Sequence, residues 1–244
     1  MAHARKADPQ GSAVGVLLDQ EKAYDRVHPE YLVQVMQAIG IPYMLTQCIV
    51  KLFFSTSVYI SINGFLAPPF TQNRGLRQGD PLSPLLFNIA FEPLLRRLHN
   101  DPNLLGGPIA PLSWKPHQKS IGHNAFFPDA LPIKVLAYAD DLLIFLSAPN
   151  EWETLTHHLH IYHLACNAKV NLAKTILFPL AGNASIPWQT LVRQKPLNWH
   201  DSSNPAPTNY LEYPIWHTQD QFALFLLSLE AKLGHAYHIV QDLQ

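Results

Sequence analysis

The sequence predicts an α+β fold in which an antiparallel sheet is backed by amphipathic helices. Two short apolar runs flank the adjacent carboxylates Asp140 and Asp141, a pattern typical of a strand–turn–strand hairpin. Another apolar run, over 14–18, has the length of a buried strand and ends at Asp19. Apolar residues recur at the spacing of one buried helical face in the segments 28–40, 82–99 and 150–166. We therefore expect three helices to cover one sheet that carries acidic residues.

The composition is that of a globular chain with one sizeable core. Of its 244 residues 48% are hydrophobic and only 14% are charged, which argues against disorder. The formal net charge of −1 does not by itself indicate nucleic-acid binding, because such domains are usually basic. Two cysteines without metal-type spacing favour a reducing compartment, and no apolar run approaches the ~20 residues of a membrane span. We expect a soluble intracellular protein of the nucleus or cytoplasm, with no membrane partner.

The chain between the first and second acidic sites begins with helices and a hairpin. The helix over 28–40 is followed by a second helix, about 43–54, which is apolar nearly all round. Alternating apolar residues over 58–62 precede Asn63-Gly64, a strong hairpin signal. We expect the partner strand near 65–72.

Local signals predict where the two later helices begin. Ser83 is placed as an N-cap, with Pro84 at the first helical position. Asn150 and Glu153 have the spacing of a capping box. The Pro/Gly-rich segment 101–132 between these helices is expected to be a long loop.

The last third of the chain is less clearly patterned. Short strands are expected at 168–172 and 175–178, whereas the Pro-, Asn- and Ser-rich segment 179–209 indicates no regular element. A short strand pair or a sheet edge is expected within 210–216. Apolar residues at helical spacing then predict a final helix over about 219–240.

The acidic residues point to metal chemistry. Two like charges about 4 Å apart repel by roughly 4 kcal/mol at an effective dielectric near 20. For an isolated pair such as Asp140 and Asp141 a solvated turn is the commoner explanation. With Asp19, a metal site becomes the better explanation than a solvated turn. Three carboxylates on adjacent strands can converge as metal-assisted nucleotidyl transfer requires.

Four segments resemble, in the same order, the palm motifs of reverse transcriptases from non-LTR (LINE-type) retrotransposons. These segments are 18–25, 75–88, 138–141 and 168–175. Residues 210–215 resemble the primer-contacting segment, with Glu212 in place of the family's usual glycine. The resemblance implies a right-hand polymerase palm over 1–180 that lacks the fingers, and a primer-grip-like edge with the start of a thumb over 181–244.

The resemblance also implies roles for individual residues. Asp19, Asp140 and Asp141 would hold two Mg²⁺ ions, with Mn²⁺ as an alternative, and Lys174 would be the general acid for pyrophosphate. The implied nucleotide-binding residues are Tyr24, Arg77, Gln78, Gly79 and Ala139. The implied primer- and template-binding residues are Arg74, Tyr138, Tyr210 and Leu211. The partners would be an RNA template, a DNA primer and dNTPs, with the oligomeric state left open.

Each role has a simpler alternative. Taken alone, Tyr24 is more often a core aromatic, and Lys174 is more often a solvated lysine. Four histidines lie close together in the sequence, as zinc ligands can, but a solvated helix face explains them better. They are His157, His158, His160 and His163. At the level of function, the alternative to an RNA-directed DNA polymerase is a catalytically inactive retroelement remnant that folds or binds nucleic acid without polymerising. Another palm-type nucleotidyltransferase, such as an RNA-templated RNA polymerase, is less compatible with Tyr24 and with 75–88.

Overall fold

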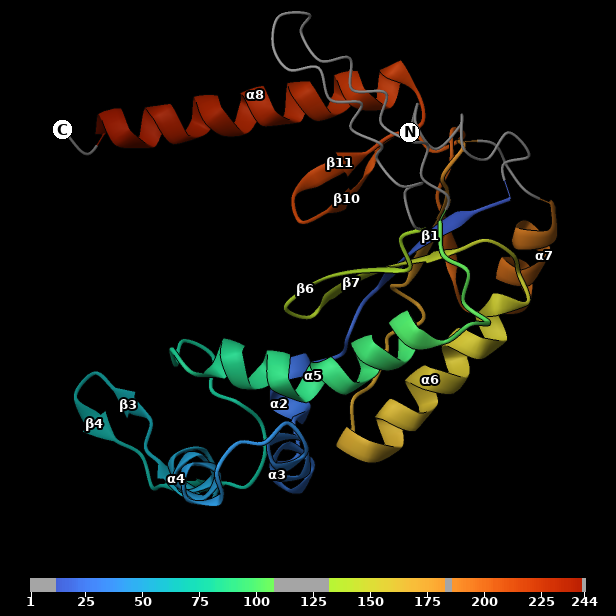
Figure 1. The fold of residues 1–244 in the computed structure, drawn as a ribbon. Helices are drawn as coiled ribbons and strands as arrows, with labels where there is room; N and C mark the ends of the chain where they lie inside the picture. The colour runs from blue at the N-terminus through green and yellow to red at the C-terminus, as the bar shows by residue number, and fades with distance from the viewer. Residues whose placement is uncertain (1–11, 108–131, 183–185, 243–244) are drawn as a thin grey trace, which may run out of the picture.

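The computed structural model describes residues 12–107, 132–182 and 186–242. Its centre is a five-stranded sheet with the strand order β6-β7-β1-β8-β9 (Figure 1). The strands are β1 (Val14–Leu18), β6 (Val135–Tyr138), β7 (Asp141–Leu146), β8 (Ile176–Pro179) and β9 (Asn198–Trp199). Neighbouring strands are antiparallel, except that β9 runs parallel to β8. With the helices described below, this sheet confirms the predicted α+β, palm-like fold.

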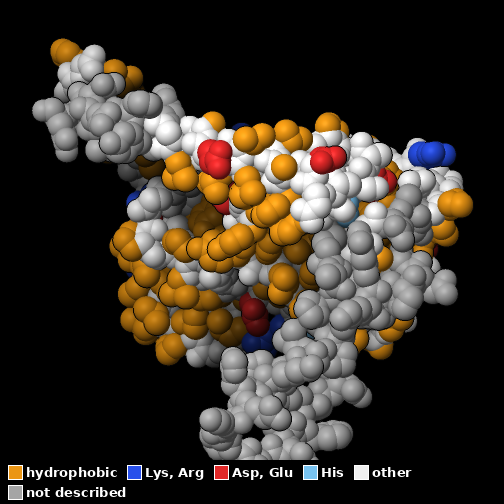
Figure 2. Space-filling view, turned by 90° about the horizontal axis from the view of Figure 1, so that it is seen from above, with side chains coloured by type: hydrophobic (Ala, Val, Ile, Leu, Met, Phe, Trp, Pro, Cys, Tyr) orange, Lys and Arg blue, Asp and Glu red, His pale blue; other side chains and the backbone are white. Residues whose placement is uncertain are grey.

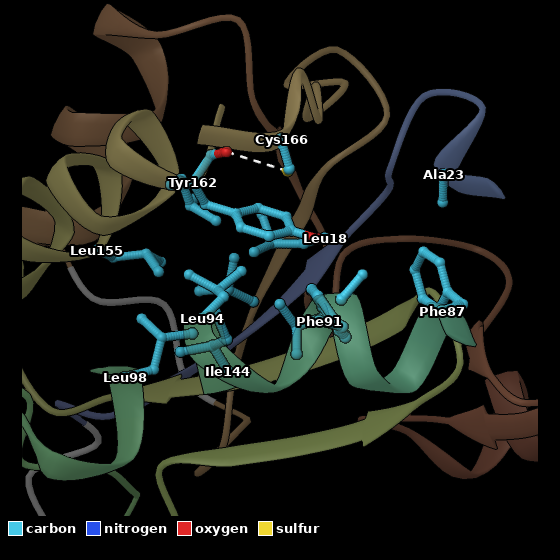
Figure 3. Close-up of a cluster of buried hydrophobic side chains, with 14 of the residues drawn as sticks. Leu18, Ala23, Phe87, Phe91, Leu94, Leu98, Ile144, Leu155, Tyr162 and Cys166 are labelled. Atoms are coloured by element: carbon cyan, nitrogen blue, oxygen red, sulfur yellow. Dashed lines mark hydrogen bonds between the residues drawn. The ribbon is translucent and has the colours of Figure 1, made fainter. Parts of the chain in front are cut away.

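The three predicted helices are present: two of them pack on this sheet, and the first in chain order packs on the other two. They are α3 (Pro29–Ala38), α5 (Ser83–Asn100) and α6 (Glu151–Cys166). Figure 3 shows side chains of α5 and α6 meeting those of the sheet in one apolar cluster. The labelled members of this cluster are Leu18, Ala23, Phe87, Phe91, Leu94, Leu98, Ile144, Leu155, Tyr162 and Cys166. The helical spacing in the sequence therefore identified the face that each helix buries.

A second hairpin lies away from the sheet (Figure 1). It follows α2 (Ala23–Arg26), α3 and α4 (Tyr43–Phe53), and its strands are β3 (Ser61–Ile62) and β4 (Phe65–Leu66). Asn63 and Gly64 form the turn with φ values of +50° and +86°, as the Asn-Gly signal predicts. The run 58–62 is not one strand, because β2 (Thr56–Val58) pairs separately with β5 (Phe70–Gln72).

The C-terminal part adds one helix and one strand that were not predicted. The helix α7 (Ile186–Gln194) lies in the segment expected to be irregular, and β9 extends the sheet beyond residue 180. Trp188 on α7 is fully buried, and its ring N–H donates to the carbonyl of Ser12 at 2.6 Å. The predicted strand pair is present as β10 (Thr208–Tyr210) and β11 (Tyr213–Ile215), followed by α8 (Gln219–Asp242).

The helix α8 projects from the rest of the fold (Figure 1). Seen from above, hydrophobic side chains cover much of the described surface (Figure 2). The exposed leucines of α8 are Leu224, Leu226, Leu227, Leu229 and Leu233. No helix within the described residues is long and apolar enough to cross a membrane.

The predicted N-cap of α5 is wrong, whereas Asn150 is the N-cap residue of α6 as predicted but makes no side-chain capping hydrogen bond. Leu82, not Ser83, is the N-cap of α5, and the Ser83 side chain is buried inside the first turn. The Asn150 side chain does not cap α6. Instead the buried Glu151 carboxylate accepts hydrogen bonds from the amides of Ser147 and Ala148, and of the distant Leu105. That last contact joins two segments that are remote in sequence, so a local motif could not reveal it.

Two further expectations have partial outcomes. Residues 168–172 form an isolated bridge from Val170 to Gln20 rather than a strand. Most of the expected loop, 108–131, lies outside the described residues. Its two ends do meet, because Gly107 and Ile133 exchange backbone hydrogen bonds.

Candidate active site

The tip of the β6–β7 hairpin carries two of the three acidic residues. Tyr138 pairs with Asp141 across the hairpin, so Ala139 and Asp140 form a two-residue turn. Ala139 has a φ of +51°, in the left-handed region that is unfavourable for a residue with a Cβ. The tip is solvent-accessible: Asp140 is half-buried and Asp141 is exposed. The hairpin therefore presents two carboxylates to solvent.

Asp19 lies beside this tip because of the strand register. β1 is antiparallel to β7, and their last pair is Leu18 with Leu142. Asp19 follows directly, at the same end of the sheet as Asp140 and Asp141. Although Asp141 is exposed as a whole residue, partial burial of its carboxyl group raises its pKa, and the negative charges of Asp140 and Asp19 raise it further. The structure thus brings three carboxylates, predicted from distant parts of the sequence, into one negatively charged group.

The donor chemistry of this group fits a divalent cation. Carboxylate oxygens are the ligands that Mg²⁺ prefers. Among the residues that the structure describes, however, no three His, Cys, Asp or Glu side chains are arranged closely enough to hold an ion together. The carboxylates would therefore have to rotate toward one another to share ions.

The histidines of α6 do not form a zinc site within the described residues. His157, His160 and His163 are exposed, as a solvated helix face requires. His158 is buried, and its Nε2 lies 2.5 Å from a carboxylate oxygen of Asp101. The solvated-face interpretation is thus correct for three of the four residues.

Tyr24 stands next to the acidic tip. Its ring stacks on Phe87 of α5, with centroids 4.7 Å apart and planes inclined by 10°. Burial raises the pKa of Tyr24, with further contributions from Asp140 and Tyr138. Tyr24, Tyr138 and Ala139 line a cavity of about 620 Å³, whose opposite wall on α5 includes Asn88. The structure therefore brings together three of the residues predicted to contact nucleotide or primer.

The other predicted nucleotide contacts line a separate cavity of about 700 Å³. Arg74, Arg77 and Gln78 border it. Lys22 and Arg26 add positive charge, and the carboxylates of Glu21 and Asp25 also line it. Arg77 also has a structural role, because its guanidinium donates to the carbonyl of Leu52 and lies 5.3 Å from the ring centroid of Phe53.

Two glycines shape the loop that borders this cavity. A Cβ on Gly75 would lie 2.8 Å from the backbone oxygen of Asp25, so only glycine allows this approach. Gly79 is exposed, with a φ of +87°, and does not border the cavity.

The segment 169–171 supports the acidic end of β1. The amide of Asn171 donates to the carbonyl of Asp19, and the amide of Glu21 donates to that of Lys169, both at 2.8 Å. The Glu21 carboxylate bridges Arg26 and Lys169, again at 2.8 Å each. Glu21 therefore joins two of the motif segments. Lys174 itself is exposed, and the structure describes no contact between its side chain and the carboxylates.

The β10–β11 hairpin lies against the acidic hairpin. The Tyr210 hydroxyl donates to the carbonyl of Leu136 on β6 at 3.4 Å. Burial raises the pKa of Tyr210, and the charge of Asp141 adds to this effect. Leu211 and Glu212 form the turn with φ values of +51° and +64°, so the residue that replaces glycine adopts a conformation that glycine favours.

Sequence reasoning missed three residues of this region. Phe87 supports Tyr24, Asn88 lines the cavity beside it, and the Gln20 side chain contacts the acidic tip. Phe87 and Asn88 were inside a recognised motif, one turn of helix beyond Ser83. Gln20 adjoins Asp19 in the sequence, but its side chain contacts Asp140, which lies 120 residues further along the chain.

Comparison with known proteins supplies a family. The family described as "Reverse transcriptase (RNA-dependent DNA polymerase)" matches residues 2–214. The chain is 30% identical over 158 residues to a transposon TX1 protein of Xenopus laevis, which covers 65% of this chain and 11% of that protein. It is 28% identical over 177 residues to a Pol polyprotein of the type-1 retrotransposable element R2 of Popillia japonica, covering 70% and 22% respectively. The chain therefore spans less than a quarter of the length of either relative.

A solved structure supports the fold. A telomerase of Candida albicans, in complex with a fragment of telomeric RNA, aligns with a TM-score of 0.53 at 10% identity. The alignment covers 90% of this chain and 32% of the telomerase chain. At this identity the likeness concerns the fold alone.

Proposed function

Because this chain belongs to the reverse transcriptase (RNA-dependent DNA polymerase) family, we propose that it provides the palm of an RNA-directed DNA polymerase of a non-LTR retrotransposon. Its relatives are named as a transposon protein and as retrotransposon Pol polyproteins, which supports that origin. The palm would extend over 1–180, and 181–244 would form the primer-grip-like edge and the start of a thumb. The observation that carries the proposal is the register of β1 on β7, which sets Asp19 beside Asp140 and Asp141.

In this proposal the three carboxylates bind two Mg²⁺ ions, or Mn²⁺ ions in their place. Ions bound there would activate the primer 3′-hydroxyl and neutralise the pyrophosphate that leaves. Asp19 and Asp140 act as principal ligands, because both are half-buried at the end of the sheet, whereas Asp141 is exposed. Lys174 is the proposed general acid and would need to move toward the carboxylates.

The two cavities support part of the proposed substrate-binding set. The incoming dNTP would lie against Tyr24 and Ala139, where the Tyr24 ring is stacked on Phe87. In this proposal the ring would exclude a ribose 2′-hydroxyl. Arg77, Gln78 and Gly79 complete the proposed nucleotide-binding set. The RNA template and DNA primer would contact Arg74, Tyr138, Tyr210 and Leu211. Positive charge from Arg74, Arg77 and Lys22 supports phosphate binding at the larger cavity.

A primer-extension assay tests this function. The protein is incubated with an RNA template, a DNA primer, dNTPs and Mg²⁺, and the product is compared between the wild type and Asp140→Asn. We expect the substitution to reduce extension by roughly a hundredfold or more, because a charge that stabilises the transition state is lost. Asp220→Asn makes the same chemical change at an exposed position on α8 and should leave extension unchanged.

The alternative proposal is an inactive remnant of a retroelement. The net charge of −1 favours it, because phosphate contacts supply most of the affinity for a nucleic-acid duplex. Absence of extension by the folded wild type, under conditions where a control polymerase works, would favour this alternative. For either function we propose a location in the nucleus or cytoplasm, where the free thiols of Cys48 and Cys166 would persist.

A further inference from the structure

The backbone pairing between β1 and β7 stops just before the acidic residues. Its last pair is Leu18 with Leu142, after which β7 gives way to the turn at Ala139 and Asp140. One described side-chain contact continues beyond this point. The Gln20 side-chain amide donates from Nε2 to the main-chain oxygen of Asp140 at 3.3 Å, in a partly buried position. This hydrogen bond therefore joins the two chain segments beyond their last backbone pair.

Gln20 reaches the tip from the core side of the sheet. Alternation along an extended chain places Leu18 and Gln20 on one face and Asp19 on the other. Accordingly, Gln20 borders a small apolar cavity together with Leu18 and Leu142 and with residues of α5 and α6. Gln20 therefore supports the tip from beneath, and Asp19 remains on the opposite face.

The backbone of Gln20 is itself held firmly. It forms a bridge with Val170, and backbone hydrogen bonds from Asn171 and Glu21 flank this bridge at 2.8 Å each. The ion pairs of Glu21 with Arg26 and Lys169 fasten the same segment. A side chain that extends from such a fixed position can hold its acceptor in place.

We propose that Gln20 is a positioning residue that fixes the main chain of Asp140 relative to Asp19. Its importance for polymerisation rests on the function proposed above. The tip needs such support because Ala139 adopts a left-handed conformation without being glycine. Without the hydrogen bond, Asp140 would sample positions too far from Asp19 for both to bind the same ions.

Hydrogen–deuterium exchange tests the positioning directly and requires no catalytic activity. Gln20→Met keeps the length of the side chain and removes the donor. We expect faster exchange in a peptide covering 137–142, with an unchanged melting temperature. Gln34→Met makes the same change on the exposed face of α3 and should exchange like the wild type. Gln20→Glu should resemble Gln20→Met, because a carboxylate cannot donate to a carbonyl.

Steady-state kinetics then link the position to the reaction. We expect Gln20→Met to lower kcat about tenfold and to leave KM for primer–template and dNTP unchanged, because a small misplacement of reacting groups slows chemistry rather than binding. Unchanged tip exchange, or global unfolding of both Gln20 variants, would overturn the proposal. Faster tip exchange in a protein whose wild type extends no primer would refute the proposed function and leave the positioning role supported.

Discussion

The hairpins β6–β7 and β3–β4 both close with a tight turn, but they stabilise that turn in different ways. Each closes with two residues and needs a positive φ in its turn. The β3–β4 turn uses Asn63 and Gly64, which tolerate that conformation. The β6–β7 turn instead forces Ala139 to a φ of +51°. Local turn chemistry is sufficient for the first hairpin, whereas the second relies on its surroundings.

Those surroundings differ sharply. β7 lies between β6 and β1, and Leu142, Ile144 and Leu146 are at most 2% exposed. In β3–β4, by contrast, Ile62 is 63% and Phe65 80% exposed. A strained turn persists where the structure around it determines its shape. The hairpin that carries the acidic residues is therefore the one held by the core.

The largest expected difference concerns the core contacts of the two hairpins. Ile144→Ala should lower the free energy of unfolding by about 2–5 kcal/mol, because it leaves a cavity in a close-packed site. Phe65→Ala should change it by less than about 0.5 kcal/mol, since the ring is mostly exposed. Urea denaturation of both variants measures this difference. Equal losses would mean that β3–β4 is also part of the core.

An intermediate effect is expected at the turns. Ala139→Gly should raise the free energy of unfolding by about 1 kcal/mol, because glycine adopts a positive φ without steric cost. Gly64→Ala should lower it by about 1 kcal/mol for the same reason. A Cβ at Gly64 would meet no atom within 4 Å, so its cost is conformational alone. The two midpoints in urea should shift in opposite directions, and a shift in the same direction would contradict this account.

The smallest effect is electrostatic and belongs only to the acidic hairpin. The pKa of Asp141 is raised in the folded state, so folding favours its protonated form. Stability from this group is therefore present below its unfolded pKa and is lost as pH rises through the folded pKa. Asp141→Asn should raise the melting temperature slightly at neutral pH and lose this advantage in acid. Melting curves at several pH values measure the difference in melting temperature between the variant and the wild type. A higher melting temperature of the variant that persists in acid would exclude the charge of Asp141 as its cause.

Much of the acidic hairpin and its support was predictable from the sequence. The apolar runs around Asp140 and the strand that ends at Asp19 are local patterns, and the structure has strands at both places. The faces of α3, α5 and α6 follow from helical spacing. The family is likewise confirmed by the match to residues 2–214. The roles of Asp19, Lys174 and the other individual site residues remain predictions.

The rest depends on contacts that no local pattern records. The Glu151 carboxylate accepts a hydrogen bond from the amide of Leu105, and the Gln20 side chain contacts Asp140, which is 120 residues away in sequence. The helix α7 was missed because Pro187 and a Pro/Asn/Ser-rich neighbourhood suggest a loop, although Trp188 is buried in the core. In each case tertiary packing, rather than intrinsic preference, decided the local structure.

The central place of β1 has a consequence for how the chain acquires its fold. Both neighbours of this early strand, β7 and β8, occur more than a hundred residues later along the chain. During synthesis its valines and leucines must wait unpaired until those segments have left the ribosome. Pairing between strands so distant in sequence slows folding and leaves apolar surface exposed in aggregation-prone intermediates. We therefore expect the nascent protein to depend on chaperones.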